Sequence, residues 1–204
     1  MNNPIMYADP SGHFVITLSA VLWAVAIGAA IGAVSGAVYG GITATANGQN
    51  VLVGVVIGAI AGGLMGAGAG VASLYLAPVI VGEAVVVGGV TYSASAALAI
   101  GSGIAFGSGF ISGMAADAFT QVFNDGGVND VGSLFVSGFQ WGLINTAGAF
   151  LGSLGGTSTL NGALLTGIFS NVTGTVGMTI DILRNRKNQK QKYNINNQSY
   201  VYCF

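Results

Sequence analysis

Residues 28–40 read GAAIGAVSGAVYG, and residues 54–70 read GVVIGAIAGGLMGAGAG. In both runs a glycine recurs at every fourth position. Four residues turn an α-helix by about 400°, so each series follows one slowly drifting face of a helix, whereas strand side chains alternate with a period of two. The glycines of the two series are Gly28, Gly32, Gly36 and Gly40, then Gly54, Gly58, Gly62, Gly66 and Gly70.

The two glycine series predict a pair of closely packed helices. Glycine destabilises a helix by roughly 1 kcal/mol per position relative to alanine, so helices this rich in glycine would not form alone in water. In lipid the backbone satisfies its hydrogen bonds internally, and small residues four apart let two helix backbones touch. We therefore predict a glycine zipper, a helical hairpin with both series on its inner face and a turn at residues 47–50. The alternative is chance drift in a chain rich in alanine, glycine and valine.

Charge is scarce and unevenly placed along the chain. Of the 204 residues 5% are charged and 35 are glycine, whereas an average soluble domain has about 25% charged residues and about 7% glycine. No Asp, Glu, Lys or Arg lies between Asp9 and Glu83. All the basic residues follow residue 183, namely Arg184, Arg186, Lys187, Lys190 and Lys192. We expect these cations to contact anionic lipid, with a bilayer rather than nucleic acid as the partner.

The apolar segments are long enough to cross a bilayer. Residues 14–46 and 51–77 both exceed the roughly 20 residues that span about 30 Å of hydrocarbon, and Pro78 closes or kinks the second segment. The valine-rich residues 79–92 fit either a short pair of strands or a frayed helix. Further helical segments are predicted over 93–123, 131–154 and 160–183.

The predicted fold class is all-α, made of glycine-zipper helical hairpins that insert into a membrane, with a short β-rich stretch near residues 79–92. The region 14–183 is the hydrophobic helical part. Residues 184–204 are too polar to bury a core and are predicted to form a disordered tail.

The residues that common catalytic and metal sites require are missing from the sequence. His13 is the only histidine and Cys203 the only cysteine, so no histidine-based triad or zinc motif can be built. A phosphate-binding loop needs a lysine after its glycines, and no lysine precedes Lys187. We expect no enzymatic activity, no cofactor and no metal.

Asp117 is an isolated carboxylate within a predicted apolar helix. A charge at the centre of a membrane helix costs about 2.5–3.5 kcal/mol on insertion scales. Asp117 lies four residues from both Gly113 and Gln121, which places the three on one helix face. It is the candidate pore-lining or pH-sensing residue, and the alternative is an interfacial position near a helix end. Asp130 is predicted to cap the helix that follows it.

The first 13 residues are predicted to form consecutive turns, and they carry a motif. Its six specified positions are Asn3, Pro4, Tyr7, Asp9, Pro10 and Gly12. They resemble the signature that closes the core of Rhs repeat-associated proteins, which are polymorphic toxins. The apolar segments, with Gly48-Gln49-Asn50-Val51 between them, also resemble the glycine-rich membrane-active regions that follow this signature in Rhs proteins of Gram-positive bacteria.

The resemblance implies that residues 1–13 end a β-rich repeat shell and that residues 14–204 are its toxic tip, secreted with the shell and used in interbacterial competition. We expect the tip to insert into and permeabilise a target membrane, alone or as a homo-oligomer. Because so apolar a chain aggregates in water, the shell of the parent chain, an immunity protein or a chaperone should cover it before release. The alternatives are a translocation segment for an enzymatic toxin that is missing here, and an unrelated holin-like membrane protein.

Overall fold

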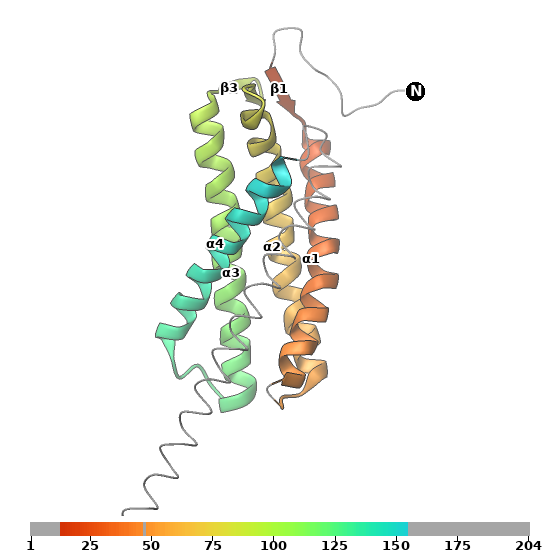
Figure 1. Cartoon of the computed structure of the whole chain (residues 1–204), viewed down its shortest axis with the longest axis vertical. Coiled ribbons are helices and arrows are strands. Elements are labelled where there is room, and N and C mark those ends of the chain that lie inside the picture. Colours follow the sequence, from red (N-terminus) through yellow and green to blue (C-terminus); the bar gives the residue numbers. More distant parts are fainter. Residues whose placement is uncertain (1–12, 47, 155–204) are drawn as a thin grey trace, which may run out of the picture.

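The computed structural model describes residues 13–46 and 48–154, which form four helices and one small sheet (Figure 1). Helices account for 81% of these residues, which confirms the predicted all-α class. In chain order the elements are β1 (His13–Ile16), α1 (Leu18–Ala46), α2 (Val51–Ile80), β2 (Ala84–Val87), β3 (Val90–Tyr92), α3 (Ala94–Asp125) and α4 (Val131–Ser153).

The α1–α2 hairpin turns between Ala46 and Val51, where the turn was predicted. The Asn50 side chain caps α2 by accepting a hydrogen bond of 3.0 Å from the Leu52 N–H. Pro78 lies inside the last turn of α2, and the helix continues to Ile80. The N–H of Glu83 then donates to the Pro78 carbonyl at 2.9 Å, so the chain leaves the helix within a few residues of the proline.

The prediction that the first helical segment begins at residue 14 is wrong. Residues 14–16 belong to β1, which pairs in parallel with β2 in the register Phe14 to Val85. Thr17 ends the strand and caps the helix, because its hydroxyl accepts from the Ala20 N–H at 3.2 Å. Pairing with β2 brings Ile16 into one buried cluster with Val85 and Leu74. This burial favours a strand over a helix at residues 14–16.

Residues 84–92 form a strand pair, one of the two conformations that the valine-rich sequence allowed. Strands β2 and β3 are antiparallel. The turn between them has positive φ at both Gly88 (58°) and Gly89 (82°), a conformation that glycine adopts without strain and that suits a two-residue hairpin. The sheet of β1, β2 and β3 lies at one end of the helical bundle (Figure 1).

Helix α4 crosses α3 and α2 obliquely (Figure 1). Asp130 caps α4 as predicted, with its carboxylate accepting from the Ser133 N–H at 3.0 Å. Helix α3 runs two residues beyond its predicted end at residue 123 and stops at Gly126, whose φ is 75°. The predicted helix 160–183, the tail 184–204 with its cations, and residues 1–12 of the motif lie outside the described residues.

Candidate membrane-inserting hairpins

The two glycine series face each other along the whole α1–α2 hairpin. One antiparallel register joins them, with the pairs Gly28–Gly66, Gly32–Gly62, Gly36–Gly58 and Gly40–Gly54, and Gly70 continues it against Ala24. A Cβ at position 32 or 36 would lie 2.9 Å from the carbonyl carbon of the opposite glycine. The structure therefore brings all nine predicted packing glycines into one backbone-to-backbone interface.

The interior of this hairpin contains almost no large side chain from α1. The buried residues of α1 are Ala20, Ala24, Gly28, Gly32, Gly40, Gly41 and Ala44. Its large residues point outward instead, and the side chain of Val34, in the middle of the helix, is 69% exposed. Small residues inside and branched apolar residues outside are the arrangement of a helix pair packed in lipid.

The outer surface of the described part is apolar over all four helices. It exposes 28 large hydrophobic side chains, far more than the isolated apolar residues usual on soluble proteins. Three helices are long and apolar enough to cross a bilayer, Leu18–Ala46, Val51–Ile80 and Ala94–Phe123, and α4 is not among them. The protein is therefore membrane-associated.

Helix α4 is held on α3 through a second set of glycines and a buried amide. The backbone carbonyl of Trp141 lies 2.5 Å from the place where a Cβ on Gly109 would stand. The Asn145 side chain, fully buried, donates from Nδ2 to the Ala105 carbonyl at 2.7 Å and to the Ser108 hydroxyl at 3.0 Å. The same nitrogen lies 3.5 Å from the Met65 carbonyl of α2, so one amide joins three helices.

Asn145 is a residue that the sequence reasoning missed. It is the only asparagine between Val131 and Leu154, a segment that is mostly apolar and whose other amide side chain is Gln140. An amide in such a segment has to find hydrogen-bond partners inside the protein, so it is the signal that could have identified this contact.

The structure places Asp117 in a hydrogen-bonded network at the α3–α4 connection. The Ser133 hydroxyl donates to Asp117 Oδ2 at 2.6 Å, and Gln121 Nε2 lies 3.3 Å from the same oxygen. Gln121 Oε1 accepts from the N–H groups of Asn129 and Asp130 at 3.0 and 2.9 Å. Asp117 and Gln121 share a helix face, as the spacing predicted, and the structure adds the hydrogen bond between them. Ser133, which the sequence did not indicate, completes the network.

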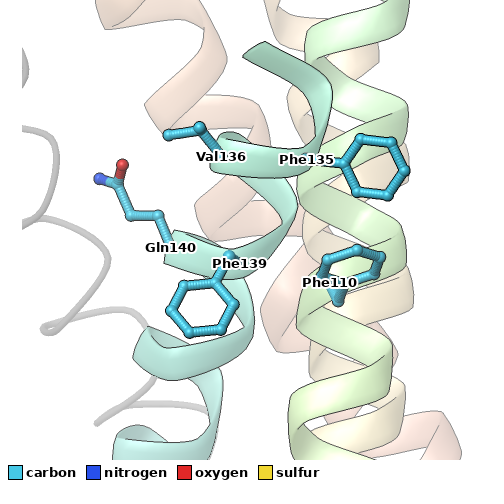
Figure 2. A pocket seen from close by; sticks show the side chains of 5 residues that line it. All are labelled: Phe110, Phe135, Val136, Phe139 and Gln140. Carbon is cyan, nitrogen blue, oxygen red and sulfur yellow. The ribbon is translucent and has the colours of Figure 1, made fainter. Parts of the chain in front are cut away.

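A shallow apolar groove of about 430 Å³ lies along α4, with one lining residue, Phe110, from α3 (Figure 2). Phe110, Phe135, Val136, Phe139 and Gln140 line it. Figure 2 shows the rings of Phe110 and Phe135 on the α3 side of α4, whereas Val136 and Gln140 point to the other side. None of the lining residues is titratable, so the groove offers hydrophobic contact and no acid–base group.

No protein-family model, curated protein or solved structure matches this chain. Among residues 13–46 and 48–154, no group of three or more His, Cys, Asp or Glu side chains could hold a metal ion. Function is therefore inferred from the two hairpins, from the absence of charged residues in α1 and α2, and from the network around Asp117.

Proposed function

We propose that the chain is the membrane-inserting tip of an Rhs-type polymorphic toxin and that it permeabilises the bilayer of a target cell without catalysing a reaction. The α1–α2 hairpin carries this proposal. Its inner face is glycine and alanine, its outer face is apolar, and neither helix contains an ionisable side chain other than Tyr39 and Tyr75. The motif of residues 3–12 supports the assignment to a toxin with an Rhs-type shell.

The hairpin is built to enter lipid as a unit. With 29 residues, α1 is about 44 Å long, which exceeds the roughly 30 Å of hydrocarbon. Its backbone hydrogen bonds are satisfied within the helix. The glycine contacts to α2 are van der Waals contacts between two backbones, which hold in lipid without a hydrophobic driving force. The turn at residues 47–50 contains no charged residue, so its passage through the bilayer does not carry the cost of moving a formal charge into hydrocarbon.

The expected partners follow from the exposed apolar surface of the helices. In water, 28 exposed large apolar side chains would drive aggregation. The proposed toxin therefore travels under its own shell, and an immunity protein or chaperone covers the tip in the producing cell. Homo-oligomers would form the permeabilising state in the membrane.

Dye release from lipid vesicles tests the proposal. The full chain, delivered from detergent, should release an entrapped dye, and its expression in the periplasm should dissipate the membrane potential. Gly32→Val should abolish release because its side chain would meet the Gly62 backbone, whereas Ala30→Val on the exposed face of α1 should retain it. Inserted protein that releases no dye would refute permeabilisation and favour the translocation segment.

A further inference from the structure

The outward face of α4 and its C-cap carries an apolar stripe that stays exposed among the described residues. The members of this outward stripe recur every three or four positions and so share one helix face, namely Val136, Phe139, Leu143, Ala147, Leu151 and Leu154. The buried Asn145 amide lies on the opposite face, where it contacts α2 and α3. Val136 and Phe139 also line the groove along α4 (Figure 2), so the outward stripe offers a concave apolar surface.

The start of α4 is acidic. The α3–α4 elbow, defined as residues 117–133, lies at the end of the bundle opposite the sheet (Figure 1). It contains Asp117, Asp125 and Asp130, whereas residues 13–154 contain no Lys or Arg at all. The basic residues of the chain all follow residue 183, namely Arg184, Arg186, Lys187, Lys190 and Lys192. The elbow thus has no cationic partner on the described helices, and the cations come after the next apolar segment.

That segment has the length to return the chain to the elbow. Helix α4 runs from the elbow toward the sheet end (Figure 1), and its 23 residues extend about 34 Å. The mostly apolar residues 160–183 would extend about 36 Å as a helix. Residues 155–159 leave a connection of a length usual between helices of a bundle, and helices joined by so short a connection lie antiparallel. A returning helix would therefore end beside the start of α4.

Residues 160–183 also carry an apolar stripe with the spacing of a helix face. Its members are Leu165, Phe169, Val172, Val176, Ile180 and Leu183. Two such stripes on antiparallel neighbours bury each other, so this segment has the surface that the outward stripe of α4 lacks.

We propose that residues 160–183 pack as an antiparallel helix on the outward stripe of α4 and bring the cations that follow them to the acidic elbow. The packing covers the groove along α4 and gathers the charges of the C-terminal half at one end of the bundle. This inference goes beyond the proposed permeabilisation and does not require it.

Disulfide cross-linking in the full chain carrying Cys203→Ser tests the packing, because cysteines whose Cα atoms lie more than about 7 Å apart do not pair. The short connection sets residue 154 beside residue 160, and hence residue 136 beside residue 178. Val136→Cys is combined in turn with Val176→Cys, Gly177→Cys, Met178→Cys and Thr179→Cys, in neutral detergent and in phosphatidylcholine vesicles. One or two of these pairs should form a disulfide within the chain.

Leu151→Cys is the matched control, because it lies on the same stripe but far from residues 176–179 in this register. It should form no disulfide with any of the four positions. The packing is overturned by the absence of a disulfide from Val136→Cys, which leaves the stripe to lipid, or by equal yields from Val136→Cys and Leu151→Cys. Disulfides that form only between two chains would assign the stripe to a second copy and overturn it as well.

Neutralising the charges tests the contact with the elbow. Replacing the five cations by Gln should slow the intramolecular disulfide by about twofold to fivefold, the effect of exposed ion pairs. Asp130→Asn should slow it too, since asparagine preserves the helix cap, whereas Glu83→Gln near the sheet should not. Rates that respond to added phosphatidylglycerol but to neither neutralisation would assign the cations to anionic lipid and overturn the contact. The readout is a disulfide and not dye release, so either proposal can fail without the other.

Discussion

Gly32 of α1 faces the backbone of Gly62 in α2 so closely that a Cβ at position 32 would lie 2.9 Å from the Gly62 carbonyl carbon and 3.0 Å from the Gly66 Cα. These neighbours are backbone atoms of a helix and cannot rotate away. The contact therefore excludes every residue except glycine, and the same geometry recurs at each of the four glycine pairs.

Gly32→Ala should lower the free energy of unfolding by about 1–3 kcal/mol, the range for overpacking a tight interface. Alanine favours a helix over glycine by roughly 1 kcal/mol. A loss of stability in Gly32→Ala must therefore come from the interface with α2 and not from helix propensity. Gly103→Ala is the matched control, because nothing lies within 4 Å of a Cβ at that position of α3, and it should be neutral or stabilising. Denaturant titration in detergent micelles measures both variants, and equal stability of the two would contradict the glycine contact.

Gln121→Met should loosen the α3–α4 elbow while preserving side-chain size. Its Oε1 accepts from the N–H groups of Asn129 and Asp130, and a lost hydrogen bond is worth about 1 kcal/mol. Hydrogen exchange at these two amides should therefore accelerate by roughly fivefold, while the amides of α1 keep their rates. Unchanged exchange at Asn129 and Asp130 would show that the side chain does not hold the connection.

Asn145→Leu should weaken the packing of α4 on α2 and α3 by about 0.6–1.7 kcal/mol, which runs from the average to the largest value found for hydrogen bonds between membrane helices. Leucine replaces the amide at similar volume, so the loss reports the hydrogen bonds to the Ala105 carbonyl and the Ser108 hydroxyl. Thr146→Ala is the control, because that hydroxyl donates to the Gly142 carbonyl of its own helix. Thermal unfolding in micelles should rank Thr146→Ala above Asn145→Leu, and the reverse order would remove Asn145 from the interface.

The inner face of the α1–α2 hairpin could be predicted from sequence because a four-residue glycine period has one structural reading and needs no knowledge of distant residues. Strand β1 could not be predicted in the same way. Phe14, Val15 and Ile16 fit a helix or a strand equally well, and pairing with residues 84–87 decides between them.

The candidate site shows the same limit. Spacing alone placed Asp117 beside Gln121, since residues four apart share a helix face. Its contact with Ser133 joins residues 16 apart across a turn, and the bonds of Asn145 to α2 and α3 join residues 37 to 80 apart. Such contacts follow from the angle at which α4 crosses its neighbours, which the apolar pattern of one helix does not encode.

The substitution Val34→Glu tests whether the outer surface of α1 faces lipid or water. Val34 is 69% exposed and lies near the middle of α1, so in water a glutamate there would disturb no packing and would improve solubility. In hydrocarbon the same charge is unfavourable by about 2.5–3.5 kcal/mol, and dye release at neutral pH should fall by about a hundredfold. Ser19→Glu, an exposed position in the first turn of α1, is favoured by the helix dipole and should retain release. Full activity of Val34→Glu would mean that this face of α1 does not meet the lipid.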